Sequence, residues 1–340
     1  MENWFNFRNK LLVIAFTSLA IFTMSFSVKS TSASTWGFYG HKRINRVAIF
    51  TLPPEMFGFY KEHIEYITEH AVDPDKRRYA MKGEAECHYI DIDYYEKYSP
   101  NPFDIVPKQW KKAVEKFTED TLRAYGIVPW HILTMKYKLQ RAFESKNVDL
   151  ILKYSTELGH YIADAHVPLH TTENYNGQLS GQRGIHGLWE SRLVEINMDD
   201  YNYFVGKSKY IEDPLENAWN YVKQSHSSLD TVLRFEKEVT KDFPSDKKYA
   251  FEQRGNLTIQ TYSYDFSQEY HKRMNGMVER RMRDAILSVG SMWYSAWVDA
   301  GQPDLSKLQN VPPSAELLKE MAELDALFQV GEAHGRDCNH

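Results

Sequence analysis

Residues 148–164, VDLILKYSTELGHYIAD, form the stretch that decides the fold. Aliphatic side chains recur there at three- and four-residue intervals, at Val148, Ile151, Leu152, Leu158 and Ile162. This spacing predicts an amphipathic helix. At 100° per residue, His160 and Asp164 lie one turn apart on the opposite side of that helix. Both sides therefore require burial, and we expect this helix to lie at the centre of the protein.

Helical periodicity dominates the rest of the chain. We expect helices over residues 110–125, 130–143 and 257–298, the last one broken near Gly290, and a final amphipathic helix after Pro312 and Pro313. Alternating strand patterns are almost absent, and no internal repeat or Gly/Pro-rich linker follows residue 36. The sequence predicts an all-α fold with a single multi-helix domain over residues 36–310. A C-terminal helix and polar tail are expected over residues 311–340.

The first 35 residues have the order of a signal peptide. Arg8 and Lys10 precede an uncharged run over residues 11–28, and the small polar stretch STSAST follows at residues 30–35. The uncharged run approaches the length of a membrane span, so an uncleaved anchor is the alternative. The small-residue stretch favours cleavage, and we expect an exported protein that is periplasmic or extracellular.

The composition narrows the possible functions. The 340 residues are 42% hydrophobic and 26% charged, which excludes an intrinsically disordered chain. With a net charge of −5, the chain has no broad positive potential that would attract nucleic acid or anionic lipid. Two cysteines, Cys87 and Cys338, are too few for a disulfide-rich scaffold or a cysteine-based metal site. We expect them to be free or adventitiously paired thiols, so any metal must be held by other residues.

A second pair of histidine and carboxylate follows the first. His186 and Glu190 are again four residues apart, and His170 lies between the two pairs, just after the helix-ending Pro168. The spacing stacks two side chains on one helical face, and imidazole and carboxylate are the ligands that zinc takes when cysteine is lacking. The alternative is a buried polar network. Two such pairs with a histidine between them favour a zinc site.

With these motifs the chain resembles, over about residues 36–300, the superfamily of bacterial zinc-dependent phospholipases C and single-strand-specific zinc nucleases. That family uses a mature N-terminal tryptophan followed by eight histidines and carboxylates. The matching positions here are Trp36, His41, Asp73, His88, His160, Asp164, His170, His186 and Glu190. The resemblance implies an all-α fold with a trinuclear zinc cleft.

The resemblance also divides these ligands among three zinc ions. The first ion would be held by Asp73, His88, His160 and Asp164, the second by Trp36, His41 and the shared Asp164, and the third by His170, His186 and Glu190. Asp75 is the alternative to Asp73, but the fifteen-residue spacing from Asp73 to His88 favours Asp73.

The role of Trp36 requires a free amino terminus, because only a deprotonated α-amino group can bind zinc. We therefore expect the active protein to begin at Trp36. Cleavage after Ala33 or Ser34 is equally permissible for a signal peptidase and would leave a longer terminus.

The ligand inventory favours hydrolysis of an anionic substrate. Three dications facing Asp73, Asp164 and Glu190 leave a positively charged pocket. Zinc lowers the pKa of bound water toward about 7, and paired metals stabilise the attacking and leaving oxygens of a phosphoryl displacement. We expect phosphodiester hydrolysis with metal-bound hydroxide as the nucleophile and no covalent intermediate. Asp73 is the expected catalytic residue, which orients that water or accepts its proton.

The spacings are mixed between the two branches of the superfamily. The short intervals from Trp36 to His41 and from Asp73 to His88 resemble the nucleases. The short interval from His170 to His186 and the final ligand Glu190 resemble the phospholipases. We expect a phospholipase C-like enzyme that acts on a phospholipid headgroup or a nucleic acid, as a monomer without a stable protein partner.

Two other functions remain as alternatives. A single-strand nuclease or nucleotidase would need aromatic side chains on the cleft rim. A secreted zinc-binding protein with a structural site is the non-enzymatic alternative, although a shared carboxylate leaves open metal positions that structural zinc avoids.

Overall fold

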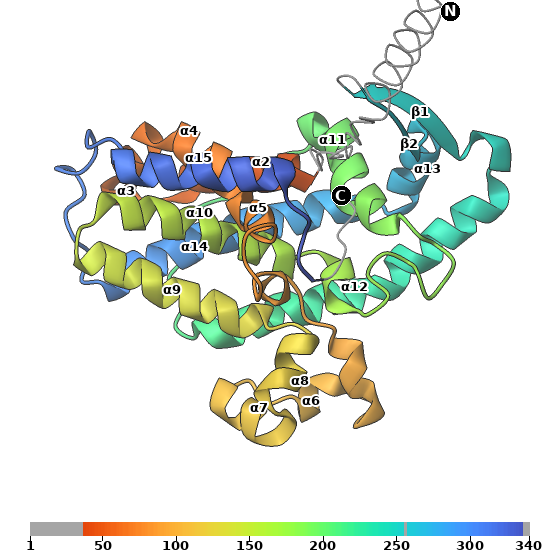
Figure 1. The fold of residues 1–340 in the computed structure, drawn as a ribbon, viewed down its shortest axis with the longest axis horizontal. Helices are drawn as coiled ribbons and strands as arrows, with labels where there is room; N and C mark the ends of the chain where they lie inside the picture. Colours follow the sequence, from red (N-terminus) through yellow and green to blue (C-terminus); the bar gives the residue numbers. More distant parts are fainter. Residues whose placement is uncertain (1–36, 255–256, 336–340) are drawn as a thin grey trace, which may run out of the picture. The chain divides into compact units, whose positions relative to one another are not determined.

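The structure is a computed structural model that describes residues 37–254 and 257–335 (Figure 1). The described chain is predominantly helical, which confirms the expected all-α class. Its one sheet is an antiparallel hairpin of β1 (Tyr249–Arg254) and β2 (Leu257–Tyr262), with Tyr249 opposite Tyr262. Within the described residues, no helix has the length and apolar character needed to cross a membrane. The expected signal peptide and Trp36 lie outside the described residues.

The helices follow one another along the chain with short connections. The first group comprises α2 (Gly37–Ala48), α3 (Pro54–Glu62), α4 (Ile64–Glu69), α5 (Asp73–Arg77), α6 (Pro102–Ile105), α7 (Trp110–Phe117) and α8 (Glu119–Ala124). The second comprises α9 (Val128–Glu144), α10 (Val148–Ala165), α11 (Leu193–Asn197), α12 (Pro214–Asp242), α13 (Tyr264–Arg273), α14 (Met277–Asp299) and α15 (Ala315–Val330). Short helical turns η3 (Ala85–Cys87), η5 (Pro168–Thr171) and η6 (Gly187–Arg192) connect segments near the centre.

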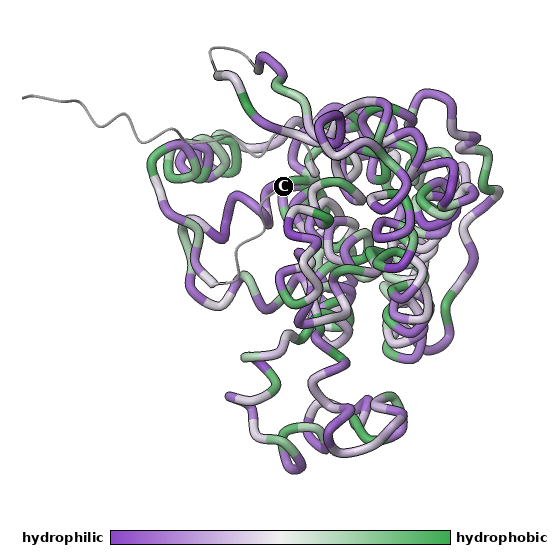
Figure 2. Tube along the Cα trace, turned by 90° about the vertical axis from the view of Figure 1, so that its right-hand side faces the viewer, coloured by the Kyte–Doolittle hydropathy of each residue, from purple (hydrophilic) through white to green (hydrophobic). Residues whose placement is uncertain are grey.

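Helix α10 lies at the centre of the fold, as its two-sided pattern predicts. The side chain of Asn147 caps its first turn by accepting a hydrogen bond from the amide of Leu150 at 3.0 Å. Helices α2, α9 and α14 pack around it, and every residue from Ser155 to Ala165 is buried. Hydrophobic and hydrophilic residues are interspersed along the helices (Figure 2), and α6, α7 and α8 form a small lobe beside α9 (Figure 1).

Several expected boundaries are wrong. The helix expected over residues 110–125 divides at Thr118, whose positive φ of 67° interrupts it and whose hydroxyl caps α8. The expected helix over residues 257–298 begins instead as strand β2, where Thr258, Ile259 and Thr261 are β-branched. It is broken near Gly276, not near Gly290, so α14 runs through Gly290 without interruption.

Two glycines permit close helix packing around α10. A Cβ added at Gly290 would lie 1.9 Å from the hydroxyl of Thr51, and one added at Gly159 would lie 2.0 Å from Oδ1 of Asn45. The amide of Asn45 also donates a hydrogen bond of 3.1 Å to the carbonyl of Thr156, which ties α2 to α10. These glycines therefore serve packing, and Gly159 sets the distance between the helices that carry His41 and His160.

We predict that Gly159→Ala destabilises the fold by about 1–3 kcal/mol, because the added methyl group overpacks the contact between α2 and α10. Gly40→Ala on α2 is the matched control, since its Cβ would lie at an ordinary 3.8 Å from Val194. The control should be neutral or stabilising by up to about 1 kcal/mol, because alanine favours a helix interior. Urea unfolding of both variants measures the difference, and equal stabilities would contradict the packing argument.

Candidate metal centre

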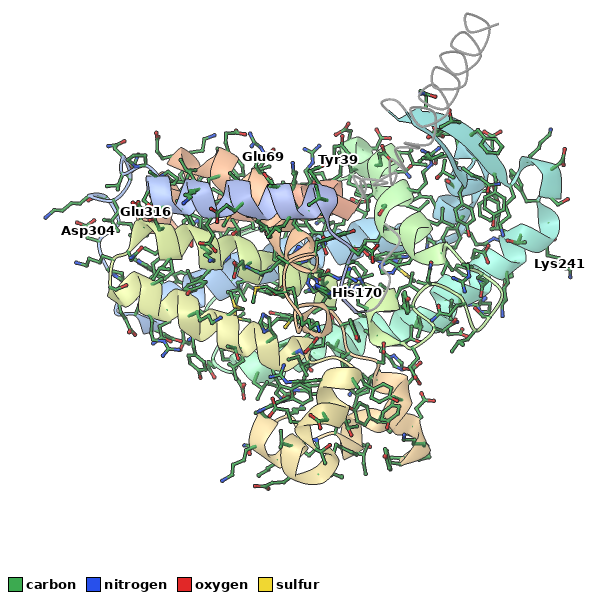
Figure 3. The ribbon with its side chains drawn as sticks, in the orientation of Figure 1. Tyr39, Glu69, His170, Lys241, Asp304 and Glu316 are labelled. Atoms are coloured by element: carbon green, nitrogen blue, oxygen red, sulfur yellow. The ribbon has the colours of Figure 1, made fainter. Side chains whose placement is uncertain are left out.

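Six segments of the chain converge on one buried group of histidines and carboxylates. Their contributions are His41 from α2, Asp75 from α5, His88 after η3, His160 and Asp164 from α10, His170 from η5, and His186 and Glu190 at η6. All eight side chains are buried. His170 lies in the interior of the fold, in front of the central helices (Figure 3). The structure thus brings together seven of the nine residues that the resemblance implies, and adds Asp75.

Asp164 lies at the middle of this group. Its Oδ2 is 2.9 Å from Nδ1 of His88 and 3.3 Å from Nε2 of His160, which is one helical turn away. Its Oδ1 is 3.5 Å from Nε2 of His41 and 3.5 Å from Nδ1 of His170. One carboxylate therefore contacts histidines from four different segments.

The second carboxylate centre is Glu190. Its Oε2 is 2.6 Å from Nε2 of His186, which the η6 turn places four residues earlier, and 3.3 Å from Nε2 of His170. Its Oε1 is 3.5 Å from Nε2 of His41. His41 thus lies between Asp164 and Glu190, and the two carboxylate centres form one continuous site.

Three sets of ligand atoms are arranged closely enough to hold a metal ion. They are His41, His160 and Asp164; Asp75, His88 and His160; and His170, His186 and Glu190. In each set the ligand atoms lie within 4.8 Å of one another. His160 belongs to the first two of these sets, whereas Asp164 belongs to the first set only.

Asp73 does not join this group, which corrects its expected roles as a ligand and as the catalytic residue. Its Oδ2 accepts a hydrogen bond of 2.7 Å from Nδ1 of His70, and its Oδ1 lies 3.1 Å from Nζ of Lys76. Oδ1 of Asp75 instead lies 3.6 Å from His160 and 3.7 Å from His88. Residues two apart on a helix point in nearly opposite directions, so α5 can direct only one of the two carboxylates to the site.

The orientation of the rings shows that the site suits a cation. Nδ1 of His160 donates to the carbonyl of Ala71 at 2.8 Å, and Nδ1 of His170 donates to the carbonyl of His88 at 2.9 Å. In a neutral ring the other nitrogen, Nε2, then presents a lone pair. Those lone pairs face carboxylate oxygens of Asp164 and Glu190, an arrangement that is repulsive unless a positive charge lies between them. Zinc is bound by this donor set of imidazole and carboxylate.

The pKa values agree with this charge balance. Burial and the neighbouring His41 lower the pKa of His160. Burial alone would raise the pKa of Asp164, but His160 and His170 outweigh it and hold that pKa well below its usual range. Burial would likewise lower the pKa of His88, yet its hydrogen bonds with Asp164 and Glu84 raise it to about 10. The carboxylates remain ionised and attract positive charge into the site.

The sequence analysis did not identify a network of hydrogen bonds and ion pairs that contacts His88. Oε1 of Glu84 lies 3.5 Å from Nε2 of His88, on the side away from the metal site, and also accepts a hydrogen bond from the hydroxyl of Tyr161. Nε of Arg77 donates to Glu84 at 2.9 Å, and another guanidinium nitrogen donates to Glu157 at 2.6 Å. Such outer partners fix the orientation of a ligating ring. The four-residue spacing from Glu84 to His88 was the available signal.

Comparison with known proteins gives the family. The family model of the S1/P1 nucleases matches residues 36–287 of the chain. The chain belongs to the S1/P1 nuclease family. No curated protein matches it closely enough to report. Members of the family are zinc-dependent hydrolases of phosphodiester bonds, so this chain is an enzyme of that class and the expected resemblance is confirmed.

We predict that Asp75→Asn removes at least one zinc ion per chain, because Asp75 is the α5 carboxylate that faces His88 and His160. Asp73→Asn is the matched control on the same short helix, and it should retain its zinc. Metal analysis after dialysis of both folded variants decides between them. Zinc loss from Asp73→Asn alone would restore the assignment made from the sequence spacing.

Proposed function

We propose that this S1/P1 family member is a phospholipase C-like phosphodiesterase that binds three zinc ions and acts as an exported monomer. The observation that carries the proposal is the convergence of histidine lone pairs and the carboxylates of Asp164 and Glu190 in one continuous buried site. Three sets of ligand atoms support three ions. The signal-like order of residues 1–35 supports export.

The residues of the chain would act together on a bound phosphodiester. Zinc in this site supplies Lewis acidity and a lowered pKa for water. Asp164 fixes the relative positions of four histidines, and Glu190 holds His186 and His170 on the other side of His41. Asp75, on α5, lies near both His88 and His160 and helps to orient their rings. The burial of all these groups excludes bulk water and strengthens their electrostatic interactions with an anionic phosphoryl group.

One observation supports a phospholipid as the first candidate substrate. The acidic net charge of −5 offers no extended attraction for a nucleic acid backbone.

Single-stranded nucleic acid is the second candidate substrate. The match to the S1/P1 nuclease model over residues 36–287 is the specific observation that favours it.

Purified protein should release phosphocholine from phosphatidylcholine in a reaction that a chelator abolishes and added zinc restores. Single-stranded DNA, RNA and a mononucleotide serve as the other substrates, and metal analysis of the same sample should give about three zinc ions per chain. Asp164→Asn is the control for contaminating activity and should be inactive on every substrate. Cleavage of nucleic acid without phosphatidylcholine would replace the phospholipase proposal with the nuclease, and one zinc ion at saturation would contradict the trinuclear site.

The amino terminus gives a separate prediction. Helix α2 begins at Gly37, and His41 on it faces the site, so the adjacent Trp36 is close in sequence to the metal ligands. We predict that the secreted active protein begins at Trp36 and that one extra preceding residue lowers its zinc content by one ion, because a displaced amino group cannot chelate. Amino-terminal sequencing with metal analysis tests this. Full zinc content in a protein that begins at Ser34 or Thr35 would show that the amine is not a ligand.

A further inference from the structure

Helix α5 is too short to fix its own rotation, so the contacts around it decide which of its sides faces the metal centre. Its five residues include Asp73 and Asp75, whose side chains point in nearly opposite directions. Oδ1 of Asp75 lies 3.6 Å from Nε2 of His160 and 3.7 Å from Nδ1 of His88. A small rotation of α5 would change both distances and loosen one of the three sets of candidate ligands.

The side of α5 that faces away from the metal centre is held by an ammonium group with two partners. Nζ of Lys76 lies 3.1 Å from Oδ1 of Asp73 and 2.7 Å from Oδ1 of Asp325 on α15. The Lys76 side chain is 13% exposed, so few water molecules compete for its charge. Asp73 and Lys76 are three residues apart and share one side of the helix. The ion pair between Lys76 and Asp325 therefore holds that side toward α15.

Apolar and backbone contacts bring α15 to the residues that follow α5. The ring of Phe328 on α15 lies 4.9 Å from the ring of Tyr79 and 5.9 Å from that of Phe38 on α2. Beyond α15, the backbone N–H of His334 donates to the carbonyl of Arg78 at 2.8 Å. Three apolar side chains of α15 are buried, Leu317, Met321 and Leu324. Helix α15 is therefore a fixed surface from which Asp325 contacts α5.

A second basic residue holds α5 from another direction. The guanidinium of Arg77 donates to Glu84 at 2.9 Å and to Glu157 on α10 at 2.6 Å. Arg77 thus ties α5 to the segment before His88 and to the central helix, while Lys76 ties it to α15. Only the second connection uses an element beyond the matched family region, which ends at residue 287.

We propose that Asp325 is a positioning residue for the metal centre: it binds the ammonium group of Lys76 outside α5 and thereby keeps Asp75 directed at the metal-binding histidines. The proposal rests on metal binding by Asp75, His88 and His160, which is part of the proposed function. Without Asp325, Lys76 retains Asp73 as its partner on this side, and its ammonium group belongs to the residue next to Asp75. A lysine that turned toward Asp75 would compete with the metal ion for the same carboxylate.

Zinc release to a chelator tests the role of Asp325. The zinc-loaded Asp325→Ala protein should release one ion about tenfold faster than the unmodified protein, because outer partners of metal ligands change metal affinity by about 10–100-fold and Asp325 acts one contact further out. Glu320→Ala is the matched control. Glu320 is also on α15 but pairs with Lys153 on α10, and its side chain is 53% exposed, against 56% for Asp325. Equal release rates from the two variants would overturn the proposal.

Two further variants separate positioning from general stabilisation. Asp325→Glu retains the carboxylate and should release zinc at nearly the original rate, whereas Asp325→Asn should resemble Asp325→Ala. In Asp75→Asn the ion that Asp75 holds is already lost, so the addition of Asp325→Ala should leave the release of the remaining ions unchanged. Faster release of those ions from the double variant would show that Asp325 stabilises the fold as a whole and would overturn its positioning role.

Hydrogen exchange of the metal-free protein measures the restraint on α5 without zinc. Loss of an exposed ion pair changes global stability little, so the urea midpoints of Asp325→Ala and Glu320→Ala should agree. The amides of residues 75–80 should exchange several-fold faster in Asp325→Ala than in Glu320→Ala, because the contact with α15 restrains local opening. Equal exchange in this segment would overturn the proposal. Neither measurement depends on which phosphodiester the enzyme cleaves, so failure of the phospholipase assay would leave these results standing.

Discussion

The structure depends on a single electrostatic constraint: buried carboxylates and histidine lone pairs face one another around Asp164. His160 and His170 donate one ring proton each to backbone carbonyls, so their remaining nitrogens present electron pairs to ionised oxygen atoms. Such an arrangement is costly in a medium of low dielectric constant unless a cation balances it. The backbone carbonyls of Ala71 and His88 are therefore as much a part of the centre as the ligands whose orientation they fix.

The rest of the fold keeps these groups in place. Helix α10 supplies two ligands on one face, and the glycine at position 159 lets α2 approach closely enough for His41 to reach them. The other ligands come from the short helix α5 and from positions in or next to the short segments η3, η5 and η6. A short segment can orient a side chain toward the centre, whereas a long helix fixes the direction of each side chain by its own axis. The hydrogen bonds of Arg77 and Glu84 restrain the segment that carries His88.

The helices and ligand pairs that follow a regular sequence period could be predicted from the sequence. The prediction failed where the direction of a single side chain decides which residue belongs to the site. The 3.6-residue pattern identified α9 and α10, and the four-residue intervals from His160 to Asp164 and from His186 to Glu190 identified the two carboxylate centres. The choice between Asp73 and Asp75 depends on which side of a five-residue helix faces inward, and such a helix has too few residues to show a pattern. The reading of Gly290 as a helix break failed for a related reason, because a glycine in a helix can equally mark a close contact.

The wide distribution of the ligands has a thermodynamic consequence. Residues that meet in the centre are drawn from His41 to Glu190, so the unfolded chain holds no preformed site and metal binds almost entirely to the native state. Free zinc then acts as a ligand in the unfolding equilibrium, and each tenfold rise in its concentration above the dissociation constant adds about 1.4 kcal/mol of stability per independent site. The melting temperature of this protein is therefore a property of the protein and its surrounding metal together.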